Sequence, residues 1–152
     1  MTGKVYQFEG EYAFLSNFYE QPIKYFEMTF QTAEHMFNAL KTNDITEAYH
    51  VMSAPTPGIA KSRGRKVTLK DNWDDVERFR AMRRTLGAKF MMNPEMAHKL
   101  ISTGVTYLEE GNWWHDNVWG VCNCGQWTCK GQGQNHLGKM LMELRDDLNK
   151  WM

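Results

Sequence analysis

The segment TAEHMFNALK, residues 32–41, predicts a short amphipathic helix at the edge of the core. Thr32 has the side chain of a preferred helix N-cap. Glu34, Asn38 and Lys41 recur at i, i+4 and i+7, so a carboxylate and an amine are expected on one side of the helix. The apolar residues recur at i, i+3, i+4 and i+7, which places them on a neighbouring face. These residues are Ala33, Met36, Phe37 and Leu40.

The composition of the whole chain is that of a folded domain. Hydrophobic residues make up 42% and aromatic residues 13% of the 152 residues, which excludes the composition of a disordered chain. We expect residues 1–152 to form one domain. Lys plus Arg and Asp plus Glu each number 18, so broad electrostatic capture of nucleic acid is disfavoured, although a local basic patch stays open.

The expected location is cytoplasmic. The N-terminal segment does not read as a signal peptide, and no stretch approaches the roughly 20 apolar residues that span a membrane, so no membrane partner is expected. The three cysteines form an odd set, which does not suit a disulfide framework.

The order of local patterns predicts a helix-rich α+β fold with a small N-terminal β portion. Runs of β-forming residues lie at 5–8, from 14 onward and at 22–30, and short strands are predicted at 106–109 and 117–121. Helices are predicted at 32–41, 45–52, 57–63, 74–92 and 94–102, and after Asn135. The helix at 74–92 is the longest of these, and residues 122–135 are expected to form an irregular loop.

Short motifs follow one another along nearly the whole chain. They are FLSNF at 14–18, PI at 22–23, AEH at 33–35 with Lys41, AK..GR at 60–65, NW at 72–73, L..KF..NP at 86–94, TG at 103–104, LE at 108–109, WG at 119–120 and a final series from Gly133 to Arg145. No single motif is specific, but their order and spacing resemble the NADAR (YbiA-like, DUF1768) family. The resemblance implies a YbiA-like fold and a hydrolase, an N-glycosidase that cleaves the bond between ribose C1 and a base nitrogen without a cofactor.

The resemblance implies two substrate classes. The preferred one is ADP-ribosylated guanine in nucleic acid, from which the enzyme removes ADP-ribose. The alternative is a ribosylamino-pyrimidine phosphate, an early riboflavin intermediate, and a non-catalytic ADP-ribose or nucleotide-binding module is a further alternative. The expected partner is therefore a small nucleotide or a modified nucleic acid, and the sequence does not indicate an oligomeric state.

Cleavage of a ribosyl C–N bond builds positive charge at C1 and negative charge on the leaving base, so it needs an anion near the sugar and a proton donor near the base. The resemblance implies that Glu34 is the carboxylate that acts as the acid/base or stabilises the positive charge on the sugar. It also implies that Lys41 attacks C1 to form a Schiff base. The helix dipole offers an alternative explanation, because it favours an acidic residue in the first turn, such as Glu34, and a basic residue at the C-terminal end, such as Lys41. Asp116 is a further catalytic candidate, with a turn cap as its alternative role.

The remaining candidates are predicted to bind substrate. Arg65 matches the GR motif and is expected to bind phosphate, unless it belongs to a solvated basic surface. Trp73 and Trp119 can stack on a base or pack in the core. The other four candidates are Asn17, His35, Gly120 and Asn135.

The cysteines follow no family motif. The pattern C-x-C-x4-C at Cys122, Cys124 and Cys129, with His115 or His136 nearby, is compatible with zinc, but it lacks a regular C-x2-C pair. We therefore expect reduced thiols in a loop and no metal site. A zinc-stabilised interaction domain is the competing hypothesis for the function of the chain.

Overall fold

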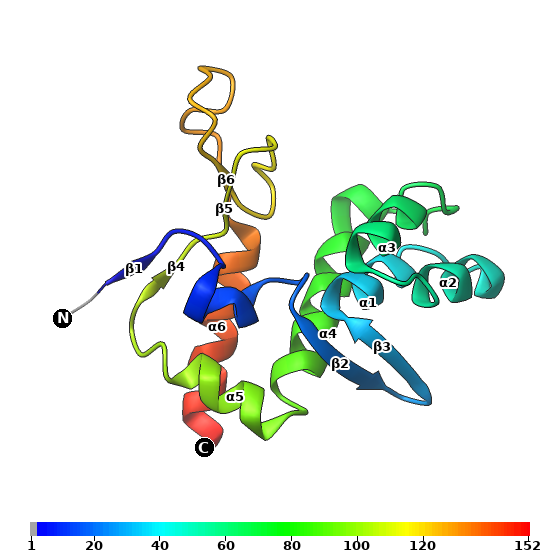
Figure 1. Ribbon diagram of the computed structural model, residues 1–152, viewed down its shortest axis with the longest axis horizontal. Helices are drawn as coiled ribbons and strands as arrows, with labels where there is room; N and C mark the ends of the chain where they lie inside the picture. The colour runs from blue at the N-terminus through cyan, green and yellow to red at the C-terminus, as the bar shows by residue number, and fades with distance from the viewer. Residues whose placement is uncertain (1–2) are drawn as a thin grey trace. The chain divides into compact units, whose positions relative to one another are not determined.

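The computed structural model describes residues 3–152, which group into two compact units (Figure 1). Unit 1 contains the described residues up to Ser16 together with Pro94–Met152, and unit 2 contains Asn17–Asn93. The prediction of a single domain over 1–152 stays a prediction. Each unit has its own elements and is described by itself.

Unit 1 begins with β1 (Lys4–Val5) and η1 (Gly10–Leu15), a 3-10 helix. The strand predicted from residue 14 is therefore wrong. Phe14 and Leu15 are both buried, and consecutive buried side chains suit one side of a tight helix better than a strand, whose side chains alternate.

Two pairs of short parallel strands follow in unit 1. β4 (Tyr107–Leu108) pairs with β1, and β5 (Gly111–Asn112) pairs with β6 (Val121–Cys122). β4 matches the predicted strand at 106–109. The strand predicted at 117–121 begins only at Val121, and β5 had no sequence signal because a Gly-Asn pair is depleted in strands.

Helices α5 (Pro94–Ile101) and α6 (His136–Trp151) complete unit 1, as predicted. The buried Arg145 guanidinium on α6 donates hydrogen bonds of 2.8 Å to the hydroxyl of Thr103 and to the carbonyl of Thr106, which fixes the segment between α5 and β4. No helix within residues 3–152 is long and apolar enough to cross a bilayer.

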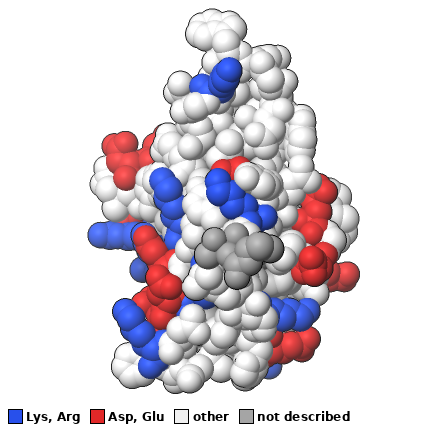
Figure 2. Space-filling model, turned by 90° about the vertical axis from the view of Figure 1, so that its left-hand side faces the viewer, with Lys and Arg blue, Asp and Glu red and all other residues white. Residues whose placement is uncertain are grey.

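The surface in Figure 2 carries Lys and Arg side chains interspersed with Asp and Glu. Charged side chains are sparse over its upper part, where the segment following β5 lies in Figure 1. Residues 117–129 of this segment contain no Lys, Arg, Asp or Glu.

Unit 2 opens with an antiparallel hairpin of β2 (Glu20–Tyr25) and β3 (Met28–Thr32). The predicted run at 22–30 is thus divided by a turn in which Phe26 adopts a left-handed φ of 54°. Ile23 and Phe30 face each other across the hairpin and are both buried.

Three short helices follow, and each begins after a residue whose side chain caps it. Thr32 caps α1 (Ala33–Ala39), Asp44 caps α2 (Ile45–Met52) and Thr56 caps α3 (Pro57–Gly64). In each case the side-chain oxygen of the cap accepts a hydrogen bond from the backbone N–H three residues later, which satisfies one of the free donors of the first turn. Pro57 occupies the first position of α3, where its missing N–H is harmless.

The predicted helix at 74–92 consists of two parts. η2 (Trp73–Glu77) is a π-helical turn, and α4 (Arg78–Phe90) is a regular helix that is shorter than α6. The backbone N–H of Glu77 bonds the carbonyl of Asn72, five residues earlier, at 2.9 Å. This wider turn shifts the helical register, and Val76 within it is exposed.

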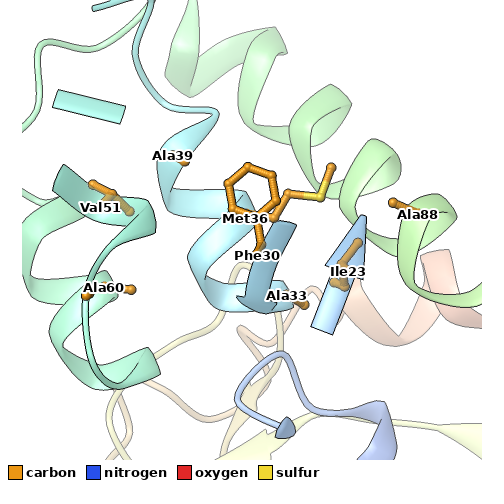
Figure 3. Packing of buried hydrophobic residues seen from close by; sticks show 9 residues of the cluster. Ile23, Phe30, Ala33, Met36, Ala39, Val51, Ala60 and Ala88 are labelled. Atoms are coloured by element: carbon orange, nitrogen blue, oxygen red, sulfur yellow. The ribbon is translucent and has the colours of Figure 1, made fainter. Parts of the chain in front are cut away.

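The core of unit 2 contains side chains from the hairpin, α1, α2, α3 and α4 (Figure 3). The large members Phe30 and Met36 lie against each other, and alanines occupy most of the surrounding positions. Small side chains permit close approach of the helices, which brings α3 against α1. The buried members are Ile23, Phe30, Ala33, Met36, Ala39, Val51, Ala54, Ala60 and Ala88.

Candidate active site

Glu34 lies in the first turn of α1 in unit 2, and its side chain is only 9% exposed. Its backbone N–H donates to the carbonyl of Asn17 at 2.9 Å. The amide nitrogen of Asn38, one turn later, donates to Glu34 Oε1 at 2.9 Å and to the Glu34 carbonyl at 2.8 Å. The carboxylate is therefore held in one orientation by a side chain of its own helix.

Asn38 is fixed from the other side by α3. Gly64, the last residue of α3, is buried and lies so close to Asn38 that a Cβ at this position would be 2.7 Å from Asn38 Cβ and Cγ. Among the described residues, neither Asn38 Oδ1 nor Asn17 Oδ1 has a hydrogen-bond partner, although both atoms are buried. Buried acceptors of this kind are costly unless a ligand or water completes them.

Lys41 follows the end of α1, and its backbone carbonyl accepts a hydrogen bond of 2.8 Å from the N–H of Lys70. Its Nζ lies 5.9 Å from the centroid of the Phe37 ring. Burial lowers the pKa of Lys41 below its ordinary value of 10.5, and the negative charge of Glu34 opposes this shift. The positive charges of Arg65 and Lys61 lower the pKa of Lys41 further. The predicted carboxylate and the predicted phosphate ligand thus both act on the pKa of the predicted amine.

Arg65 and Trp73 differ in exposure. Arg65 caps the C-terminus of α3 and is exposed, as a ligand for an incoming phosphate requires. Trp73 is 7% exposed and its ring centroid lies 5.5 Å from that of Phe37. Its burial favours the core-packing alternative, in which Trp73 supports the ring beside Lys41.

Asn17 and His35 are both buried, but only Asn17 retains an acceptor for a ligand. The Asn17 amide nitrogen lies 3.3 Å from the sulfur of Met82. His35 is completely buried, with Nδ1 2.8 Å from Thr32 Oγ1 and Nε2 2.8 Å from the Ala54 carbonyl. Because both ring nitrogens have partners, the geometry gives His35 a positioning role in place of the predicted contact with substrate.

The other predicted site residues belong to unit 1. Asp116 Oδ1 accepts hydrogen bonds from the backbone N–H groups of Val118 at 3.1 Å and Trp119 at 2.9 Å, so the turn-cap alternative accounts for this oxygen. Trp119 is half-buried, and its ring meets that of His136 edge to face at 6.3 Å.

Gly120 and Asn135 have structural roles within unit 1. A Cβ at Gly120 would collide with the backbone carbonyl of Glu110, so the motif glycine permits close approach of two chain segments. Asn135 Oδ1 accepts from the N–H of Glu110 at 3.1 Å, and its amide donates to the Leu108 carbonyl at 2.9 Å. The Asn135 side chain is therefore occupied by these two hydrogen bonds, and it makes no capping hydrogen bond to α6.

The comparison with known proteins decides the family. The NADAR domain model matches residues 5–149. The chain belongs to the NADAR family. The family assignment confirms the resemblance based on the order of motifs.

Two curated relatives and one solved structure characterise this family membership. N-glycosidase YbiA of Escherichia coli (strain K12) is 35% identical over 145 residues, covering 94% of this chain and 86% of the relative. The NMR structure of E. coli YbiA matches with a TM-score of 0.83 and 32% identity over 99% of this chain and 88% of that one, which confirms the α+β fold. The riboflavin biosynthesis protein VVA0006 of Vibrio vulnificus is 31% identical over 147 residues, 95% of this chain but 38% of that protein. The predicted enzyme class, a hydrolase of N-glycosyl bonds, is confirmed.

Lys89 is a candidate functional residue that was not predicted from the sequence. It is 1% exposed, and burial lowers its pKa from 10.5 to about 7. Its Nζ lies 5.6 Å from the centroid of the Tyr19 ring and 5.1 Å from that of Phe90. The signal was present in the KF motif at 89–90, since a family lysine beside an apolar run is rarely buried without a reason.

Proposed function

We propose that this NADAR protein hydrolyses the bond between ribose C1 and a guanine nitrogen, and that it removes ADP-ribose from ADP-ribosylated guanine in nucleic acid. One observation carries the proposal. A buried carboxylate, Glu34, is oriented by Asn38 and interacts electrostatically with Lys41, an amine whose pKa burial lowers. A carboxylate that acts on an amine of lowered pKa suits a ribosyl transfer through a covalent intermediate, because a lower pKa makes the nucleophilic neutral form of the amine easier to reach.

The two residues divide the chemistry between them. As the C1–N bond breaks, its electron pair goes to the base nitrogen, which takes up a proton from a water molecule. The neutral amine of Lys41 forms a bond to C1 and passes a proton to the Glu34 carboxylate. The ring oxygen then leaves C1 with its electron pair and takes this proton, which gives a Schiff base. Water hydrolyses the Schiff base and restores the amine.

Two basic residues at the end of α3 favour a substrate that carries a diphosphate. Lys61 and Arg65 both act on the pKa of Lys41, so two positive charges lie near the proposed nucleophile. Arg63 between them is already engaged, because its guanidinium donates to the His50 carbonyl at 2.9 Å. Two cations match the two phosphates of ADP-ribose better than a single phosphate.

A riboflavin intermediate is the second candidate substrate. The observation that favours it is the similarity to VVA0006 of Vibrio vulnificus, which is named a riboflavin biosynthesis protein. A ribosylamino-pyrimidine phosphate has the same ribose C1–nitrogen bond, so the same carboxylate and amine serve both reactions. The cytoplasmic location remains part of the proposal and suits either substrate.

The two substrates are distinguished by direct comparison. The protein is incubated separately with guanine-ADP-ribosylated DNA and with ribosylamino-pyrimidine phosphate, and release of ADP-ribose or free base is followed by mass spectrometry. We expect release from the modified DNA, and loss of this release in Glu34→Gln with binding and fold retained. Release from the pyrimidine alone would establish the second candidate, and binding without turnover of either substrate would establish a non-catalytic module.

The covalent intermediate is tested by borohydride reduction during turnover. We expect a stable adduct on Lys41, located by peptide mass spectrometry, and no adduct in Lys41→Arg. Lys89 is the matched control, because burial also lowers its pKa. An adduct on Lys89, or none on either lysine, would contradict the role of Lys41.

The phosphate ligand is tested with Arg65→Ala, and Lys66→Ala is the control because Lys66 is an exposed neighbouring cation. We expect Arg65→Ala to weaken substrate binding at least tenfold, because a charge-assisted hydrogen bond contributes about 1.5–3 kcal/mol. Equal affinities in the two variants would remove the phosphate role of Arg65.

A further inference from the structure

Four metal-ligating side chains converge in the segment that contains β6. They are His115, Cys122, Cys124 and Cys129, and the ligand atoms that they offer all lie within 4.8 Å of one another. We propose that this Cys3His cluster binds one Zn²⁺. The cluster lies entirely within unit 1 and shares no residue with the Glu34 and Lys41 site, so the inference does not depend on the proposed reaction.

The distances within the cluster fit tetrahedral coordination of one ion. His115 Nδ1 lies 3.2 Å from the sulfur of Cys129 and 3.7 Å from the sulfurs of Cys122 and Cys124. With a Zn–S distance of about 2.3 Å and a Zn–N distance of about 2.0 Å, a regular tetrahedron places nitrogen and sulfur about 3.5 Å apart. The ring nitrogen thus occupies one vertex, with the three sulfurs at the others.

A disulfide or a single thiol–imidazole hydrogen bond accounts for fewer of these contacts than a metal ion does. A disulfide would use two of the three cysteines, and all three are free. A hydrogen bond between a thiol and an imidazole nitrogen pairs one sulfur with one nitrogen, whereas three sulfurs surround the same nitrogen here. Thiolate and imidazole together are a donor set that zinc prefers among common divalent ions.

The backbone around the cluster is arranged to present these side chains. His115 adopts a left-handed φ of 69°, a conformation that non-glycine residues seldom take. Asn117 Oδ1 accepts the N–H of Cys122 at 3.0 Å, and Cys122 also pairs with Asn112 across β5 and β6. The strained backbone of His115 and the hydrogen-bonded backbone of Cys122 indicate that the fold specifies the geometry of the cluster.

The segment also lacks the usual means of stabilising a long loop. Residues 117–129 contain no charged side chain, and β6 is two residues long. Trp113, Trp114 and Trp127 are 51%, 59% and 85% exposed, so they contribute little to a core. A metal ion that joins His115 to Cys129 would replace the missing core, because binding energy at a structural zinc site is folding energy.

Zinc here is structural. Four protein ligands fill a tetrahedral site and leave no position for water or substrate. Asp116 follows the first ligand directly, so the metal would fix the turn that Asp116 caps through Val118 and Trp119. The expectation from sequence of unligated thiols and no metal site is replaced by this proposal, since the irregular C-x-C-x4-C spacing concealed a convergence that only the fold shows.

The metal itself provides the test. The full chain is purified without chelators or a histidine tag, and zinc is measured by plasma mass spectrometry. We expect about one zinc per chain, and less than a fifth of that in Cys129→Ser and in His115→Ala. His98→Ala removes an exposed histidine of α5 outside the cluster and should keep the full zinc content. Full zinc content in Cys129→Ser and His115→Ala would place the ion elsewhere.

Cobalt substitution of the wild-type chain tests the geometry without any variant that must fold. Zinc is removed with a chelator under reducing conditions and Co²⁺ is added. Intense visible bands with a thiolate-to-metal charge-transfer band would support a tetrahedral sulfur-rich site. Weak octahedral bands, together with wild-type zinc content below a tenth of an ion per chain, would overturn the proposal.

Discussion

Replacement of Gly64 by alanine should damage the candidate active site from a helix that contains none of its proposed catalytic residues. The new Cβ would lie 2.7 Å from Asn38 Cβ and Cγ and closer still to Asn38 Oδ1. Rotation of the Asn38 side chain relieves the amide contacts but not the contact with Cβ, which is fixed by the backbone of α1. Either α3 moves away from α1, or Asn38 rotates and breaks its bond to Glu34 Oε1.

The magnitude follows from three contributions. Alanine in place of a helical glycine stabilises by up to about 1 kcal/mol. Overpacking of a buried site costs about 1–3 kcal/mol. Loss of a hydrogen bond to a charged group adds about 1.5–3 kcal/mol if Asn38 rotates. We therefore expect Gly64→Ala to lower the free energy of unfolding by about 0–3 kcal/mol if α3 moves and by about 1.5–6 kcal/mol if Asn38 rotates, and kcat/KM to fall by about 10- to 100-fold.

The assay combines urea unfolding with turnover well below the melting temperature. Gly87→Ala is the matched control, because Gly87 lies inside α4 of the same unit and no atom lies within 4 Å of its Cβ position. This control should gain up to about 1 kcal/mol and keep full activity. If Gly64→Ala is as stable and as active as Gly87→Ala, then α3 does not hold Asn38 and the account of how Glu34 is oriented is refuted.

Three other predictions concern charge and capping in unit 2. Between pH 7 and 10 the unfolded chain holds a proton at Lys89 that the folded chain lacks, because burial lowers the folded pKa to about 7. The free energy of unfolding should thus rise with pH by up to about 1.4 kcal/mol per unit relative to Lys89→Met, and parallel urea-unfolding curves would contradict this. For Lys41, kcat/KM should rise with pH and level off below 10.5, because burial lowers the pKa of the attacking amine; a profile that falls over this range would exclude the neutral amine. Thr32→Val removes the α1 cap and the partner of His35 Nδ1, so it should cost about 1–2 kcal/mol in urea unfolding, and an unchanged midpoint would show that the cap is dispensable.

The helices were predictable wherever their signals are local. Thr32, Asp44 and Thr56 each form the bond that a capping residue needs with its own first turn, so the starts of α1, α2 and α3 follow from the sequence. The π-turn at 73–77 was not predictable, because its five-residue hydrogen bond to Asn72 leaves an almost unchanged hydrophobic pattern. The strand β5 depends on pairing with β6, and a Gly-Asn pair carries no signal of such a partner.

The candidate site was predictable as a set of residue types but not as a set of roles. Family order selected Glu34, Lys41 and Arg65, and the charges of Glu34 and Arg65 both shift the pKa of Lys41. The same order selected His35 and Asn135, whose side chains are occupied by hydrogen bonds to the protein. A motif does not distinguish a residue that contacts substrate from one that holds its neighbours in place, because both are needed for the same reaction.

Two roles that the sequence did not assign depend on contacts between distant segments. Gly64 is a helix end in the sequence, yet in the fold it leaves room for the side chain that orients Glu34. His115 and Cys129 are separated by a loop of irregular composition, yet their ligand atoms lie 3.2 Å apart. In both cases the role of the residue depends on which distant residue the fold brings next to it. The orientation of Glu34 therefore depends on α3 as well as on its own helix, because Gly64 leaves room for the Asn38 side chain that bonds the carboxylate.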